Sequence, residues 1–132
     1  PDRAATTHPM VICAMTKILR DMGADVVIGD SPGGPFTPAL VHGVYRTCGM
    51  EQAAQNAGAV LNEDFEQVTV YEEKSVVLRQ MQLCRYLTRA DAVIDCAKLK
   101  THGLTQYTGA VRTFMDACRA LSRWNTIFGC RH

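Results

Sequence analysis

Apolar positions follow two different periods along the chain, and these periods predict alternating helices and strands. Between residues 9 and 22 an apolar residue recurs every three or four positions, as on one face of a helix. Thr6 or Thr7 can cap this helix, Pro9 suits its first turn and Gly23 suits its end. The apolar run 26–29 follows directly and predicts a buried strand. This order is typical of half a parallel α/β unit.

The remaining pattern predicts a single α/β domain over residues 1–132. The domain is expected to be a three-layer, Rossmann-like sandwich with a mainly parallel sheet, incomplete at one or both ends. In it, the strands at 26–29 and 92–96 are buried and neighbouring or nearly so. Residues 124–132 show no clear period. The other expected elements are helices at 37–49, 51–56, 83–88 and 111–121, strands at 59–61 and 68–70, and a hairpin return at 75–78.

A polar cluster follows each of the two main predicted strands. Because the carboxyl ends of parallel strands share one edge of a sheet, and ligands bind at that edge, the two clusters are expected to surround one cavity. After the first strand come Asp30, Ser31, Gly33 and Gly34, and after the second come Lys98, Lys100, Thr101 and His102.

The first cluster has the composition of an anion-binding loop. Gly33 and Gly34 permit close backbone approach, and successive N–H groups can form a nest for an anion. Asp30 and Ser31 complete the candidate ligand-binding set. A tight strand-to-helix turn with an Asx cap from Asp30 explains the same residues without a ligand.

The second cluster suggests proton transfer beside a bound anion. Lys98, Lys100 and His102 alternate, so they would share one side of an extended loop. Two ammonium groups would hold a carboxylate or phosphate and favour a neutral His102, which can act as a general base or bind a metal. We therefore assign catalysis to His102 and Lys100 and ligand binding to Lys98 and Thr101. A solvated basic loop is the alternative.

Charge and cysteine spacing argue against several classes of function for this chain. With 47% hydrophobic residues and a net charge of +1, the chain is expected to be globular and cytoplasmic, binding neither nucleic acid nor membrane. Its six cysteines contain no C-x-x-C pair, which argues against a zinc ribbon or an iron–sulfur cluster held by this segment. We expect buried or half-buried thiols. Cys96, beside Lys98, could instead have a lowered pKa. His8 either helps to cap the first helix or serves as a metal ligand.

Several motifs resemble the family called domain of unknown function 362. They lie at residues 5–9, 27–34, 98–105 and 107–111. The resemblance implies an α/β protein associated with iron–sulfur centres, in which a 4Fe–4S cluster sits in a separate ferredoxin-like segment. The family usually has a strand before the Thr6-Thr7-His8-Pro9 motif, and after Val111 this chain departs from the family pattern. A partial domain is therefore expected.

These observations lead to one favoured function and two alternatives. The favoured function is a redox-associated domain that binds a small anionic molecule at its strand-end loops and works with a ferredoxin-like segment in cis or in trans. No cofactor is expected on this segment alone. One alternative is a non-redox enzyme for small carboxylates, because the fold is similar to the amino-terminal half of nickel-dependent lactate racemases. The other is a non-catalytic binding or scaffold module.

Overall fold

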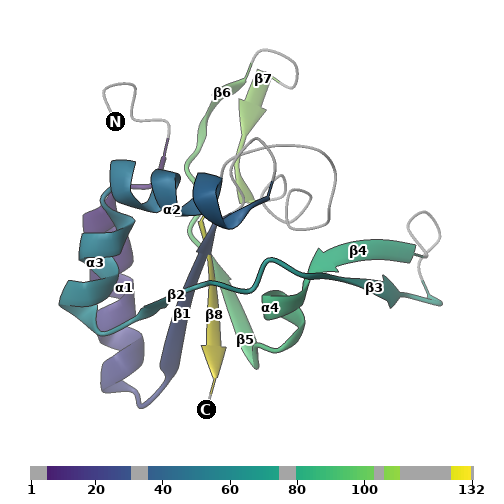
Figure 1. Cartoon of the computed structure of the whole chain (residues 1–132), viewed down its shortest axis with the longest axis horizontal. Helices are drawn as coiled ribbons and strands as arrows, with labels where there is room; N and C mark the ends of the chain where they lie inside the picture. Colours follow the sequence, from purple (N-terminus) through teal and green to yellow (C-terminus); the bar gives the residue numbers. More distant parts are fainter. Residues whose placement is uncertain (1–5, 31–35, 75–79, 103–105, 111–125, 132) are drawn as a thin grey trace.

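The computed structural model describes residues 6–30, 36–74, 80–102, 106–110 and 126–131. Figure 1 shows the helices and strands of this part of the chain. The helices are α1 (Pro9–Asp21), α2 (Pro38–Thr47), α3 (Met50–Ala57) and α4 (Arg85–Thr88). The strands are β1 (Asp25–Asp30), β2 (Val60–Leu61), β3 (Gln67–Tyr71), β4 (Gln80–Cys84), β5 (Ala92–Asp95), β6 (Lys100–His102), β7 (Gln106–Thr108) and β8 (Thr126–Arg131).

Helix α1 lies at the predicted residues, but its N-cap is not the expected Thr6 or Thr7. His8 is its N-cap, Pro9 lies in its first turn, and Gly23 follows it with a φ of +88°. Glycine adopts this left-handed conformation without the steric cost that a Cβ atom brings. The apolar stripe is only partly buried, because Ile12 is fully buried whereas Ile18 remains 55% exposed.

The main sheet has four strands in the order β2-β1-β8-β5. Strand β1 is parallel to β2, but β8 runs antiparallel to both β1 and β5. The described residues also form two antiparallel hairpins, β3-β4 and β6-β7. The expectation of a mainly parallel Rossmann-like sheet is therefore wrong. The physical reason is that β8, from the stretch without a clear period, runs antiparallel between β1 and β5, the two strands that were expected to be neighbouring or nearly so.

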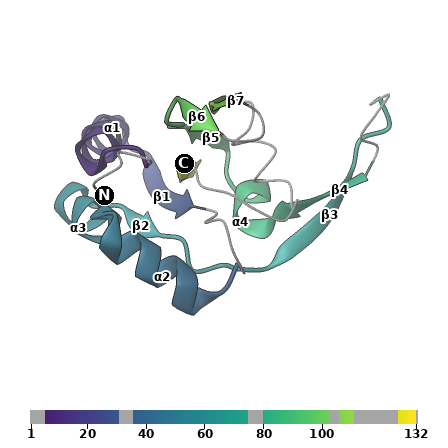
Figure 2. The same ribbon diagram turned by 90° about the horizontal axis from the view of Figure 1, so that it is seen from above.

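The expected three-layer arrangement is also wrong for the described part of the chain. Helices α1, α2 and α3 pack on the face of the sheet that carries Val26 and Ile28, and the core lies between them. The opposite face carries the single turn α4, whose Tyr86 covers Gly29. Figure 2 shows α1 and α3 side by side, and Figure 1 shows α2 lying across the carboxyl end of β1.

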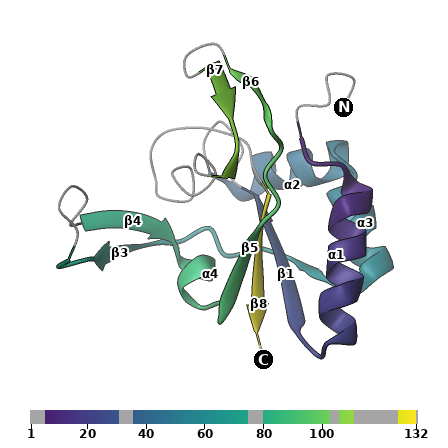
Figure 3. The same cartoon turned by 180° about the vertical axis from the view of Figure 1, so that it is seen from behind.

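The two hairpins extend from this body in different directions. The β6-β7 hairpin continues from the end of β5, beyond the carboxyl edge of the sheet, and the β3-β4 hairpin projects sideways as an arm (Figure 3). The strands expected at 26–29, 59–61, 68–70 and 92–96 are present, as are the helices expected at 37–49 and 51–56. The expectation that the strand at 92–96 is buried is wrong, because β5 is at most half-buried. Of the helix expected at 83–88, only Arg85–Thr88 is helical, because residues 83 and 84 belong to β4. The helix expected at 111–121 and the hairpin return expected at 75–78 lie outside the described residues.

Candidate functional site at the carboxyl edge of the sheet

Strands β1 and β5 end at the same edge of the sheet and at the same level. Both run antiparallel to β8, so they are parallel to each other, and Gly29 and Asp95 both lie opposite Ile127. One intervening strand separates them by about 10 Å. The segments that follow Asp30 and Asp95 therefore leave the sheet at one edge, which the prediction of a shared site for the two polar clusters requires.

The segment before α1 joins this edge. The Thr7 hydroxyl donates a hydrogen bond of 2.5 Å to the carbonyl oxygen of Cys96, the residue directly after β5. His8 is exposed, and its Nδ1 accepts a hydrogen bond of 3.2 Å from the Met10 N–H. The capping role that the sequence offered for His8 is confirmed.

Asp30 lies inside the protein at the end of β1. It is 3% exposed, and its N–H donates a hydrogen bond of 3.1 Å to the hydroxyl of Tyr45 from α2. Burial first, and then the charge of Asp30, raises the pKa of Tyr45, so this phenol stays protonated. The link fixes the end of β1 to the helix that lies across it. Asp30 is thus a buried anchor of the edge.

The lysine cluster lies on an extended segment that becomes strand β6. Lys98 and Lys100 are half-buried and Thr101 is exposed. Strand β6 pairs with β7, with Lys100 opposite Thr108 and His102 opposite Gln106. The extended backbone expected for Lys100 and His102 is present, although the side chain of His102 lies outside the described part of the structure. Ser31, Gly33 and Gly34 also lie outside the described residues.

Thiols and metal ligands do not gather in the described part of the chain. Among its residues, no group of three or more His, Cys, Asp or Glu side chains could hold a metal ion. Cys13, Cys48, Cys84 and Cys96 form no disulfide with one another and are buried or half-buried, as expected. Burial, followed by the charge of Asp95, raises the pKa of the Cys96 thiol, so the alternative of a lowered pKa is wrong.

Tyr86 is a residue of this edge that sequence reasoning missed. A Cβ atom on Gly29 would lie 2.5 Å from the Tyr86 ring and 2.6 Å from its hydroxyl oxygen, so the ring packs directly on the β1 backbone. The two carboxylate oxygens of Asp95, at the same level of the sheet, are also shielded from solvent. A lone tyrosine in a short helical turn gives no local signal of such a contact.

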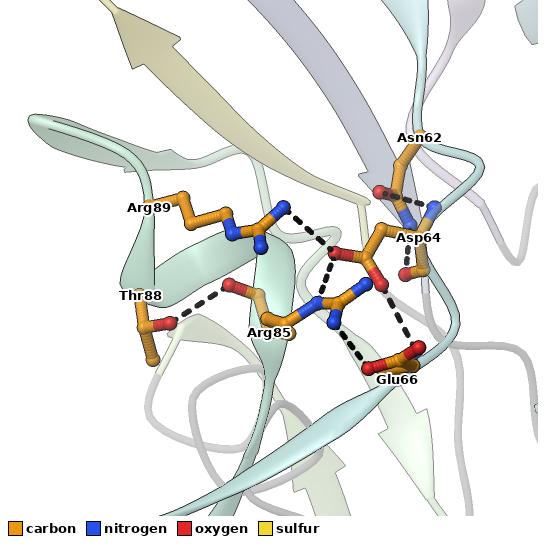
Figure 4. Close-up of polar contacts among 6 residues, drawn as sticks. All are labelled: Asn62, Asp64, Glu66, Arg85, Thr88 and Arg89. Carbon is orange, nitrogen blue, oxygen red and sulfur yellow. Dashed lines mark hydrogen bonds and ion pairs between the residues drawn. The ribbon is translucent and has the colours of Figure 1, made fainter.

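A network of charged side chains joins α4 to the loop after β2 (Figure 4). Arg85 Nε donates to the Asp64 carboxylate at 2.7 Å, and another guanidinium nitrogen binds the Glu66 carboxylate. Arg89 lies 3.7 Å from Asp64. A cavity of about 260 Å³ lies next to this network. Its lining includes Val27, Val60, Leu61, Asp64, Tyr86 and Arg89.

Comparisons with known proteins give a family but no activity. No curated protein and no solved structure matches the chain. None of the helices in the described ranges combines the length and the apolar character needed to cross a membrane. The model of the family described as a domain of unknown function, DUF362, matches residues 1–125, and the chain belongs to this family.

Proposed function

We propose that the carboxyl edge of the four-stranded sheet binds a small anionic molecule. The ammonium groups of Lys98 and Lys100 supply the positive charge, and Ser31, Gly33, Gly34 and Thr101 supply hydrogen-bond donors. The observation that carries this proposal is the common level at which β1 and β5 end, since ligands of α/β sheets bind beyond carboxyl ends of strands. Asp30 holds the end of β1 in place through Tyr45.

The reaction that fits this site is proton transfer. Lys100 holds the anionic group while neutral His102, two residues further along β6, moves a proton at a neighbouring carbon or oxygen. Positioned acid–base groups typically contribute about 10² to 10⁴ in rate.

Titration calorimetry with inorganic phosphate and with lactate tests the binding step. The expected result is measurable binding of at least one anion to the unaltered chain, with binding about tenfold weaker in Lys100→Ala. Lys74→Ala is the matched control, because it removes the same charge at an exposed lysine in the turn after β3. The arm formed by β3 and β4 projects away from the edge that carries β6 and β7 (Figure 1). Equal affinities in all three proteins, or a dissociation constant above about 1 mM for both anions, would refute the anion site.

The redox part of the proposal rests on family membership alone. We propose that the domain works with a 4Fe–4S cluster carried by a ferredoxin-like segment in cis or in trans. Iron analysis of the full-length gene product after anaerobic reconstitution tests this. A product that binds no iron, with no closely spaced cysteines outside this domain, would remove the redox role and leave the anion site unaffected.

The lactate titration also addresses the two alternatives. Binding of lactate with loss of optical activity would favour an enzyme acting on small carboxylates. A scaffold module instead predicts that Lys100→Ala and His102→Ala change neither ligand binding nor any activity of the full-length protein.

A further inference from the structure

A cavity lies on the face of the sheet opposite α1, α2 and α3. It has a volume of about 260 Å³ and is enclosed by the β1-β2 pair, the loop after β2 and the residues around α4. Val27 belongs to this face, because side chains alternate along β1 and those of Val26 and Ile28 point to the helices. None of its described lining residues belongs to the carboxyl-edge site. The cavity is therefore a separate candidate for ligand binding.

The wall of the cavity is mostly apolar. Aliphatic side chains and one aromatic ring form it, from Val27, Val60, Leu61, Tyr86 and Ala90. Val60 is 65% exposed although it belongs to the main sheet. Binding sites for small molecules combine such walls with a few polar groups, and this volume lies just below their usual range of about 300–1,000 Å³. The cavity therefore suits a small molecule with a compact apolar body.

A fixed turn presents one carboxylate at the cavity. The Asn62 side chain is 3% exposed, accepts the N–H of Asp64 at 3.1 Å and donates to the Asp64 carbonyl oxygen at 3.0 Å. The Asn62 N–H donates to the carbonyl oxygen of Ile28 in β1 at 2.8 Å. Glu63 lies between these two residues, so its backbone is held on both sides. Its side chain is exposed and makes no ion pair or hydrogen bond within the described part of the chain.

The charges at the cavity favour a cation over an anion. The hydrogen bond from Arg85 lowers the pKa of Asp64, so this carboxylate is ionised at neutral pH. Arg85 at 2.7 Å and Arg89 at 3.7 Å already compensate it (Figure 4). The lining then holds two carboxylates, Glu63 and Asp64, and one guanidinium, Arg89, which leaves one negative charge. An aromatic ring in the wall also favours a cation.

We propose that this cavity is a second binding site and that it takes a small primary amine with a compact apolar body. The body packs against Val27, Leu61 and Ala90, and the ammonium group pairs with the Glu63 carboxylate. This site does not depend on the proposed function, because it uses none of the residues of the carboxyl-edge site. Benzylamine is a suitable probe, since it carries one ring and one ammonium group at neutral pH. Benzyl alcohol has nearly the same shape and no charge.

NMR titration of the backbone amides of the whole chain tests the site. We expect saturable shifts of the Leu61, Glu63 and Ala90 amides with a dissociation constant for benzylamine of about 1 mM, because so small a ligand gains limited binding energy. Glu63→Gln should weaken benzylamine binding about threefold, the size expected of an exposed ion pair, and leave benzyl alcohol binding unchanged. Glu73→Gln, at an exposed glutamate in the turn after β3, is the matched control and should change neither.

Ala90→Leu tests the apolar wall. The larger side chain occupies part of the cavity, so binding of both probes should weaken about tenfold. The amide spectrum without ligand shows whether this variant keeps the fold. Because Glu63 is exposed, Glu63→Gln tests the ammonium contact whether or not Ala90→Leu folds.

Each outcome supports or overturns the amine site. Saturable binding at these amides that prefers benzylamine and weakens in Glu63→Gln supports it. Absence of shifts at these amides up to about 10 mM benzylamine overturns the site. Equal affinity for benzylamine and benzyl alcohol, or tighter binding of benzoate, overturns the amine as the ligand class. None of these results involves Lys98 or Lys100, so failure here leaves the anion site standing, and failure of the phosphate titration leaves the amine site standing.

Discussion

Gly29 has no side chain, and the Tyr86 ring packs in the space that a side chain at this position would occupy. A Cβ atom would meet ring atoms at 2.5–2.6 Å, well inside van der Waals contact. Gly29→Ala is therefore expected to lower the free energy of unfolding by about 1–3 kcal/mol through overpacking. Urea unfolding measures this change.

Gly43→Ala is the matched control for that substitution. Gly43 lies within α2, and a Cβ atom there would meet nothing within 4 Å. The variant should be more stable by about 0.5–1 kcal/mol, because alanine is the better helix former. Equal effects at both glycines would contradict the close packing of Tyr86 on β1.

Tyr45 and Tyr86 are both buried tyrosines near Asp30, yet their hydroxyls have opposite roles in stability. The Tyr45 oxygen accepts the N–H of Asp30, which is buried. Tyr45→Phe leaves that N–H without its partner and should cost about 1–3 kcal/mol of unfolding free energy. Tyr86→Phe should cost no stability, because the Tyr86 hydroxyl has no hydrogen-bond partner among the described residues. Chemical denaturation of the two variants measures both changes, and an equal loss of unfolding free energy in both would contradict the hydrogen bond at Tyr45 and its absence at Tyr86.

For single residues, the sequence identifies candidate site residues better than it predicts which side chains touch in the folded protein. Asp30, Lys98 and Lys100 are recognisable because polar residues follow apolar runs, and this local signal does not depend on the rest of the fold. Tyr86 gives no such signal, since its role arises from a glycine on a strand far away in the chain. The burial of Asp30 is likewise set by Tyr45 from another helix. Tertiary contacts of this kind have no periodicity to detect.

Among the elements, the arm formed by β3 and β4 depends on its attachment at the base. Arg85 follows β4 directly and bridges Asp64 and Glu66, which precede β3, while its N–H donates to the Glu66 carbonyl oxygen at 2.8 Å. Two-stranded hairpins are marginally stable in water on their own. The ion pairs in Figure 4 therefore stabilise the arm by closing it at the end nearest the body.

This closure predicts a dependence of stability on acid pH. The hydrogen bond from Arg85, with help from the Glu66 N–H, lowers the pKa of Asp64 below its usual value. Because the pKa is lower in the folded than in the unfolded chain, the stabilisation is present above about pH 4 and is lost as pH falls through the folded pKa. Asp64→Asn should cost about 0.5–1 kcal/mol at neutral pH and progressively less in acid, as measured by urea unfolding across pH.

Glu73→Gln serves as the control for that measurement. Glu73 is exposed in the turn after β3, so its substitution removes one carboxylate outside the network. The unfolding free energy of Glu73→Gln should fall with decreasing pH in the same way as that of the unaltered chain. If Asp64→Asn shows the full acid dependence of the unaltered chain, the Asp64–Arg85 pair does not contribute to it.

The sequence predicted helices and strands well where the local pattern of apolar residues is strong. It predicted them poorly where a strand forms only through pairing with a distant strand. The helix after Pro9 has a strong periodic pattern, and the strand at Val26 is a continuous apolar run, so both were placed correctly. β6 was expected only as an extended loop, because three residues are too few to show alternation and its pairing with β7 is tertiary. Strand β8 was missed because residues 124–132 show no clear period, and its place in the sheet is fixed by two strands distant in the chain.

For the whole molecule, β8 decides the topology. It pairs with β1 over six positions and with β5 over four, so it holds together the two strands whose ends form the candidate site. Without it, β5 would have no neighbour in the four-stranded sheet and β1 would retain only β2. The common edge from which both polar segments leave thus depends on a strand beyond residues 1–125, which the family model matches.

Gly129→Pro tests this dependence, because Gly129 lies between Val27 of β1 and Val93 of β5. Proline removes the N–H that a central strand needs, so the variant should lose about 2–3 kcal/mol of unfolding free energy. Hydrogen exchange should show faster exchange of the β5 amides and unchanged protection in the β3-β4 hairpin, which pairs only with itself. Glu73→Pro, in an exposed turn, is the control for introducing proline. Protected β5 amides in Gly129→Pro would mean that β8 does not lie between β1 and β5, and the shared edge would lose its structural basis.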